Sequence, residues 1–190
     1  MTVDAVTLSA GVWLTLAFHP TGAPATIAVS PSSGLELCKV AIDTLAIEGC
    51  APGSADGVNT FTTQNAHLAY AIRHSGAGAD VTTSVRLSYT SADTWLLLQP
   101  PSGATSIKAT FTPRSTRVGA EAFVVPEYSR PTDAQINFGG SGFVSAGLSQ
   151  CDFLGTESDC RATVTPGHVV TVTMTMTPPQ PRVALQLAWL

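Results

Sequence analysis

The stretch that decides the fold is residues 95–112, which reads Trp-Leu-Leu-Leu-Gln-Pro-Pro-Ser-Gly-Ala-Thr-Ser-Ile-Lys-Ala-Thr-Phe-Thr. It consists of a short apolar run, a turn rich in Pro and Gly, and a strictly alternating segment. In that segment the apolar side chains share one face and the polar ones share the other: Ile107, Ala109 and Phe111 against Lys108, Thr110 and Thr112. A repeat of two residues is typical of a β-strand with one buried face.

A similar stretch occurs earlier in the chain. It runs from Trp13-Leu-Thr-Leu16 through Pro, Gly and Ala to Ile27, as the later one runs from Trp95 to Ile107. Both halves also end alike, because each carries a cysteine pair, a Pro-Gly turn, a Thr-rich strand and a final apolar hairpin. These parallels predict an internal duplication, with the boundary near residues 89–93.

The rest of the chain consists of short alternating runs separated by Pro, Gly, Ser and Asp. No helical periodicity of useful length appears. Residues 35–48 come nearest, but their β-branched residues and bracketing cysteines favour a strand followed by a loop. We expect strands at 3–9, 12–18, 25–30, 35–42, 58–63, 67–73, 81–89, 94–98, 104–112, 118–125, 134–138, 142–146, 161–165, 168–177 and 182–189.

Regular strand spacing without helices favours β-sandwiches. The sequence therefore predicts an all-β chain with two tandem antiparallel sandwich domains of jelly-roll or immunoglobulin-like type, residues 1–90 and 91–190. No long linker separates the halves, so we expect them to pack closely or to share strands.

Four cysteines fall into two local pairs, Cys38 with Cys50 and Cys151 with Cys160. None belongs to a CxxC motif or stands at zinc-ligand spacing from a histidine. This pattern favours one local disulfide in each half, with four buried free thiols as the alternative. Disulfides indicate an oxidising compartment.

The composition excludes several classes of function. Charged residues make up 12% of the chain, and 9 basic against 13 acidic residues give a net charge of -4. No cluster of Lys or Arg supplies the basic surface that nucleic acids or anionic membranes require. No run approaches the roughly 18 apolar residues of a membrane-spanning helix. The first residues also lack the basic region of a signal peptide, which indicates a removed leader or another export route, as for a virion protein.

Several segments of the second half resemble a known module. Pro101-Ser-Gly-Ala-Thr-Ser-Ile-Lys-Ala-Thr110, Gly119-Ala-Glu-Ala-Phe-Val-Val125 and Ser129-Arg-Pro-Thr132 follow one another in the order of the motifs of pre-peptidase C-terminal (PPC) domains. The cysteine loop 151–160 and the strand after Pro166-Gly167 come next, also as in that family. Glu121 and Ala122 stand where the family typically carries two Asp. The resemblance implies a secreted, non-catalytic sandwich appended to hydrolases, some of which bind polymeric substrates.

Candidate catalytic groups are sparse. The four histidines, His19, His67, His74 and His168, are predicted at strand ends or on the surface. Gly140-Ser141-Gly142 lacks the spacing of the G-x-S-x-G nucleophile elbow, so no catalytic residue is expected. The candidates for a calcium site are Asp152, Glu157 and Asp159, which share one cysteine-closed loop and offer oxygen ligands. The sequence favours a solvated acidic loop over this site, and no other cofactor is expected.

The three tryptophans have different predicted roles. Trp13 and Trp95 lie beside leucines and are predicted in the core, with a partner surface or a sugar-stacking platform as alternatives. The apolar end of the sequence makes Trp189 and Leu190 the candidates for an interface.

These observations predict a non-catalytic extracellular accessory, binding or adhesion module, and no enzyme. Its expected partners are a protein or polysaccharide surface or copies of itself, and neither nucleic acid nor membrane insertion is expected. The alternative is a structural subunit built on a jelly-roll sandwich, such as a viral capsid or decoration protein or an extracellular filament. The low charge, the first residues and the apolar end of the sequence favour this alternative.

Overall fold

The computed structural model describes residues 1–18, 26–41, 46–52, 59–62, 69–76, 78–88, 95–125, 131, 133–146, 150–152, 160–180 and 182–189. Within them the chain is all-β. The strands are β1 (Thr2–Leu8), β2 (Trp13–Phe18), β3 (Thr26–Ser30), β4 (Leu35–Val40), β5 (Ile47–Pro52), β6 (Asn59–Thr62), β7 (Ala69–His74), β8 (Val81–Ser88), β9 (Trp95–Gln99), β10 (Ser106–Phe111), β11 (Arg117–Val124), β12 (Ala134–Gly139), β13 (Phe143–Ala146), β14 (Gln150–Asp152), β15 (Cys160–Val164), β16 (Val170–Met176) and β17 (Val183–Trp189). None of these described residues forms a helix with the length and apolar character needed to span a membrane.

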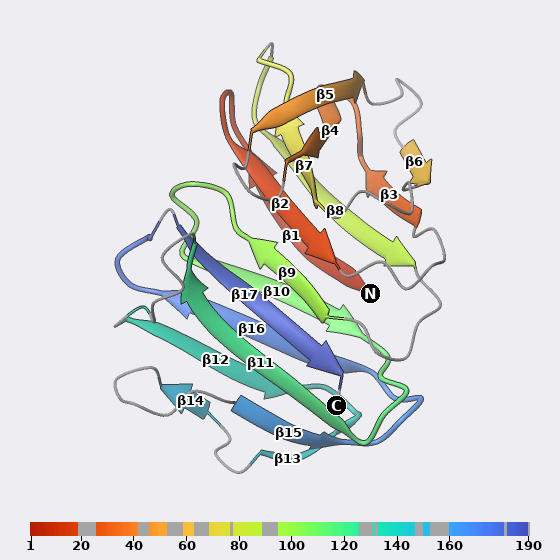
Figure 1. The fold of residues 1–190 in the computed structure, drawn as a ribbon, viewed down its shortest axis with the longest axis vertical. Coiled ribbons are helices and arrows are strands. Elements are labelled where there is room, and N and C mark those ends of the chain that lie inside the picture. The colour runs from red at the N-terminus through yellow and green to blue at the C-terminus, as the bar shows by residue number, and fades with distance from the viewer. Residues whose placement is uncertain are drawn as a thin grey trace.

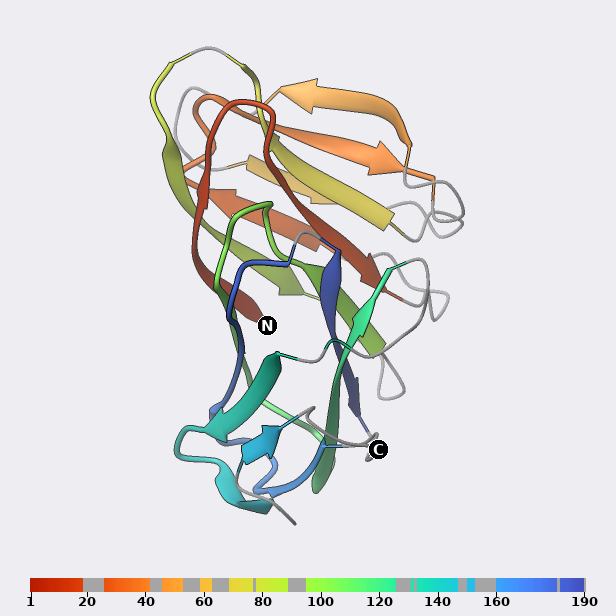
Figure 2. The same cartoon turned by 90° about the vertical axis from the view of Figure 1, so that its left-hand side faces the viewer.

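The strands form two antiparallel sheets that lie face to face (Figures 1 and 2). One has eight strands in the order β14-β12-β16-β10-β1-β8-β3-β6, and the other has nine in the order β13-β15-β11-β17-β9-β2-β7-β4-β5. The predicted antiparallel all-β class is therefore confirmed.

Each half of the sequence contributes to both sheets. In Figure 1 the strands of residues 1–90 occupy the upper part of the molecule and those of residues 91–190 the lower part. When each half is numbered from its own first strand and β13 is set aside, both halves give the same order: first, eighth, third, sixth in one sheet and second, seventh, fourth, fifth in the other. The strand β13 is an addition at the edge, beside β15.

This shared order shows that the two tryptophan stretches, which resemble each other in sequence, lie on different strands of their halves. Trp13 begins β2, the second strand of its half, whereas Trp95 begins β9, the first strand of its half. These strands are neighbours in the nine-stranded sheet, where Leu16 faces Leu98. The two stretches look alike because both form central, apolar strands, and they do not occupy equivalent places.

The halves meet edge to edge. The strands β1 and β10 join them in the eight-stranded sheet, and β2 and β9 join them in the nine-stranded sheet. A single cluster of buried side chains runs between the sheets through both halves, from Leu37 and Ile72 to Ile136 and Val164. The expectation that the halves pack closely is confirmed, and the predicted boundary at residues 89–93 lies outside the described residues.

Alternation of burial explains why these segments form strands. Along β16, Val170, Val172, Met174 and Met176 are at most 1% exposed, and the threonines between them are half-buried on the outer face. The β-branched threonines suit a solvated sheet surface. Each expected strand overlaps an observed one. Sequence reasoning missed β5 and β14, which are short strands in or beside the two cysteine loops.

Candidate functional site

The two joints between the halves differ, and the one in the eight-stranded sheet is open. Pairing between β1 and β10 is limited to Thr2 with Thr110 and Val3 with Ala109, although both strands continue. Beyond this pairing lies a cavity of about 660 Å³, lined by residues 4–7 of β1 and by residues 101–108, which form the turn before β10 and its first residues. We call this cavity the junction cleft.

A break in the register of β1 explains the opening. On its other side β1 pairs with β8, and the register shifts between Val3 and Val6. An extra residue of this kind bends a strand and increases its local twist. The bend begins where the pairing with β10 ends, so β1 follows β8 and separates from β10.

Polar side chains lie at the point where the strands part. Oδ2 of Asp4 accepts a hydrogen bond from Oγ1 of Thr110 at 2.8 Å, and Nζ of Lys108 lies 3.4 Å from the same oxygen. The side chains of Lys108 and Asp4 are 50% and 36% exposed, so solvent screens this ion pair and it contributes only about 0–1 kcal/mol. Its effect is mainly to place a charge of each sign at the closed end of the cleft.

A tight turn, residues 101–104, forms part of the wall opposite β1. The Ala104 N–H donates to the Pro101 carbonyl at 3.0 Å, and Gly103 has a φ of 85°. A positive φ at the third residue of such a turn favours glycine strongly. The Pro-Pro-Ser-Gly sequence thus fixes the wall through its backbone.

The cleft has an apolar floor and a polar rim. Val6 and Ile107 are 7% and 4% exposed, whereas Ala5, Thr7 and Ser106 are exposed. Buried and exposed side chains alternate along β10 and, after the break at Asp4 and Ala5, along β1. The cleft therefore has one buried and one exposed face, as a β-strand does.

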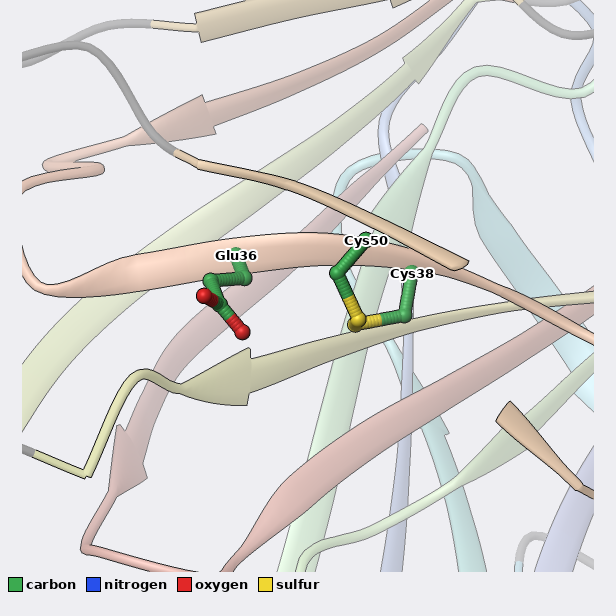
Figure 3. A group of neighbouring side chains, drawn as sticks. All are labelled: Glu36, Cys38 and Cys50. Carbon is green, nitrogen blue, oxygen red and sulfur yellow. A yellow bond between two sulfur atoms is a disulfide. The ribbon is translucent and has the colours of Figure 1, made fainter. Parts of the chain in front are cut away.

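The predicted disulfide of the first half is confirmed. Cys38 on β4 is bonded to Cys50 on β5, the outermost strand of the nine-stranded sheet (Figure 3). Glu36 lies near the two sulfur atoms, as Figure 3 shows, and its Oε2 accepts a hydrogen bond from Nε of Arg73 at 2.8 Å. This group is not a metal centre, because metals are bound by thiolates and both sulfurs are in the disulfide.

The disulfide prediction for the second cysteine loop is supported at Cys160 only. Cys160 begins β15, is buried and is disulfide-bonded, but the side chain of Cys151, its predicted partner, lies outside the described residues. The calcium candidates fall in the same region: Glu157, Asp159 and the side chain of Asp152 are all outside the described part. The Cys151–Cys160 bridge and the calcium site both stay predictions.

The two described histidines, His74 and His168, form hydrogen bonds with main-chain groups. His74, at the end of β7, is 3% exposed: its Nδ1 accepts from the Gly76 N–H at 3.1 Å, and its Nε2–H donates to the Ala79 carbonyl at 3.0 Å. His168 is exposed in a turn, where its Nδ1–H donates to the Pro166 carbonyl at 3.3 Å. Both lie at strand ends or in turns, as expected, while His19 and His67 are outside the described residues.

The Gly140-Ser141-Gly142 segment forms a turn against the chain before β16. The Gly142 N–H donates to the Val169 carbonyl at 2.7 Å, and a Cβ on Gly140 would lie 2.5 Å from that oxygen. Gly140 also has a φ of 93°. These glycines are needed for close backbone approach, and nothing in this turn resembles a nucleophile elbow.

The core prediction for Trp13 is wrong. Its side chain is 45% exposed, although Thr15 and Ala17 on the same face of β2 are each 5% exposed. Leu14 and Leu16 point to the opposite face, into the core between the sheets. The side chain of Trp95 is outside the described residues. The backbone of Trp189 pairs with Val118 at the end of β17, but its side chain and Leu190 are not described, so the interface prediction stays untested.

Sequence reasoning missed the junction cleft. A signal was present at Val3-Asp-Ala-Val6, where alternation breaks because two residues separate the valines. Nothing in the sequence indicated that β10 would be the neighbour of this break, since that pairing joins residues more than 100 positions apart.

Comparison with known proteins adds no assignment. No protein-family model matches the chain, and a search of curated proteins finds no match. The resemblance to PPC domains therefore stays a prediction.

Proposed function

We propose that this chain is a non-catalytic extracellular binding or adhesion module of the PPC-like β-sandwich type, and that the junction cleft is its ligand site. The observation that carries the proposal is the cleft itself. Its volume of about 660 Å³ falls in the range of roughly 300–1,000 Å³ that is usual for ligand sites. Among the described residues no group of nucleophile, base and orienting acid lines it.

The strand order supports a tandem jelly-roll architecture. Eight strands split four and four between two sheets, in the order given above, are the connectivity of a jelly roll, a fold used by lectin and viral capsid domains. We assign one jelly roll to residues 1–90 and the second to residues 91–190, joined through the two sheets. A ligand site at the meeting point of two units is a common arrangement.

The disulfide and the composition support an extracellular location. A local bridge such as Cys38–Cys50 persists in oxidising compartments. The bridge ties the outermost strand, β5, to its neighbour β4. Such a bond keeps the edge of the sheet attached, as suits a module outside the cell.

The proposal is tested with an immobilised panel of cellulose, chitin, collagen and fibronectin. Ala5 is exposed and lines the cleft, so Ala5→Trp fills it. Ala79→Trp is the matched control, because Ala79 is exposed in a turn and is not among the cleft residues. We expect binding to at least one panel member, weakened at least tenfold by Ala5→Trp and unchanged by Ala79→Trp. Absence of binding, or equal loss in both variants, would refute the proposal.

A structural subunit is the second candidate, and the sheet edges favour it. In the described part of the chain, the edge strands are β14 and β6 in the eight-stranded sheet and β13 and β5 in the nine-stranded sheet. Edge strands offer unpaired main-chain groups to other copies of the chain. Size-exclusion chromatography with light scattering separates the candidates. A closed particle or fibre would support the subunit, and a stable monomer would count against it.

A further inference from the structure

We propose that the junction cleft binds an extended peptide segment of a partner protein, which inserts between β1 and β10 as an additional strand and makes the eight-stranded sheet continuous. This inference rests on the proposed binding role of the cleft and names the chemistry of its ligand.

The edge of β10 that faces β1 continues beyond the pairing of the two strands. The Met176 N–H donates to the Thr105 carbonyl at 2.8 Å, so the main-chain groups of Thr105 face β16. Main-chain direction alternates along a strand, so the N–H and C=O groups of Ser106 and Lys108 face the opposite way, toward β1. Within the described residues, however, the pairing of β10 with β1 stops at Ala109.

The cleft lies within a sheet, between two of its strands. On their far sides, β1 pairs with β8 and β10 pairs with β16 along its full length. Among the described residues, the facing edges of these two strands have no neighbour beyond the pair Val3 and Ala109, so the main-chain groups of Ser106 and the N–H of Lys108 are open toward the cleft. An extended peptide can hydrogen-bond to N–H and C=O groups on both of its sides. Binding of a peptide in this way, as an added strand, is called β-strand addition.

The side chains around the cleft differ between its two faces. The buried Val6 and Ile107 and the exposed Thr7 and Ser106 fix the two faces of an inserted strand. Small apolar residues of the peptide fit over the first pair, and polar residues lie beside the second. The closed end of the cleft carries one cation and one anion, Lys108 and Asp4, which are paired with each other, so charge does not select the ligand strongly.

Hydrogen exchange tests the premise without any ligand. The amide of Ile107 faces β16 in the ladder, whereas the amides of Ser106 and Lys108 face the cleft. We expect the Ser106 and Lys108 amides to exchange at least tenfold faster than the Ile107 amide, measured by nuclear magnetic resonance. Equal protection of these three amides would mean that the edge is already satisfied, and would overturn the proposal.

The binding test uses a pool of synthetic ten-residue peptides that alternate Ala, Val or Ile with Ser, Thr, Lys or Glu. A second pool has the same sequences with every other backbone nitrogen methylated, which removes the N–H groups of one edge. We expect the first pool to contain binders that slow exchange at Ser106 and Lys108, and the methylated pool to bind at least tenfold more weakly. Equal binding of both pools, or no binder at millimolar concentration, would refute strand insertion.

A pair of variants tests the same edge from the protein side. Ser106→Pro removes the N–H that faces the cleft while leaving the bonds to β16, and proline is tolerated at the first residue of a strand. Ser106→Ala keeps the N–H and removes only the hydroxyl. We expect Ser106→Pro to weaken peptide binding at least tenfold and Ser106→Ala to leave it within twofold. Equal affinities would contradict the proposal, and the comparison of the two pools decides the matter if Ser106→Pro does not fold.

The outcomes also separate this inference from the proposed function. If cellulose or chitin binds in a manner blocked by Ala5→Trp while the peptide pool does not bind, the cleft is a ligand site but strand insertion is wrong. If the peptides bind and every panel member fails, strand insertion holds, and the extracellular surfaces chosen as natural targets are wrong.

Discussion

The two joints between the halves of this molecule are equivalent in strand order, because each pairs the first strand of one half with the second strand of the other. They differ in how far the two strands pair. In the nine-stranded sheet, β2 and β9 pair from Thr15 with Gln99 through Phe18 with Leu96. In the eight-stranded sheet, β1 and β10 pair at only two positions and then enclose a cavity. The first joint is closed and the second is open.

The difference follows from the side chains available at each joint. The closed joint is built from leucines, and Leu16, Leu96 and Leu98 are at most 1% exposed. The open joint begins at Asp4, within the register shift of β1 between Val3 and Val6, where the carboxylate contacts Thr110 and Lys108. Burial of leucine at the closed joint contributes free energy that holds the halves together.

The largest effect is expected at the closed joint. Leu98 is fully buried and faces Leu16 on one side and Leu185 on the other. Leu98→Ala leaves a cavity there and should lower the free energy of unfolding by about 2–5 kcal/mol, measured by urea denaturation. Val144, which is 59% exposed, supplies the control, because Val144→Ala should change it by less than about 0.5 kcal/mol. Similar losses in both variants would show that the closed joint has no special role.

The next largest effect is expected at the outer edge of the nine-stranded sheet, which is compared with the β2–β9 joint. Removing the disulfide with Cys38→Ala and Cys50→Ala frees β5 and should lower the free energy of unfolding by about 3 kcal/mol in the chain-entropy model. Limited proteolysis should then cut first near β5 and leave the β2–β9 joint intact. First cleavage at that joint would contradict the assignment of the edge as the part held by the disulfide.

A smaller effect is expected at the wall of the open joint. Gly103 has a φ of 85°, and a Cβ there meets no neighbour within 4 Å, so Gly103→Ala is penalised by conformation alone, about 1–2 kcal/mol. Gly49→Ala is the control, because Gly49 also has open space but no positive φ. If the two variants are equally stable in thermal unfolding, the turn does not constrain the wall of the cleft.

The smallest effect is a pH dependence at the start of β1. The Met1 amine donates to the Leu87 carbonyl at 2.8 Å, and burial, together with the nearby Arg86, lowers the pKa of this amine below its ordinary 8.0. The folded chain then binds fewer protons than the unfolded chain, so stability should rise as the pH increases from the lowered pKa to 8.0. Acetylation of the amine should remove this dependence in urea titrations, and an unchanged profile would exclude the amine as its source.

Much of the secondary structure was accessible from local pattern. Alternation in β10 predicted its buried face, and the spacing of Cys38 and Cys50 predicted their disulfide. The exposure of Trp13 was not predicted, because an apolar strand in the middle of a sheet has two faces and its neighbours decide which one is covered. The same limit applies to β5, whose residues carry no alternation and form a strand by pairing with β4.

The sequence by itself determined the all-β class, the positions of most strands and the pairing of the first two cysteines. These depend on periodicity and on short separations along the chain. Only the tertiary structure decided that the sheets continue across the two halves, and that one joint closes while the other opens into a cleft. Those features depend on contacts such as Val3 with Ala109, which join distant segments and are set by the packing of both sheets around one core.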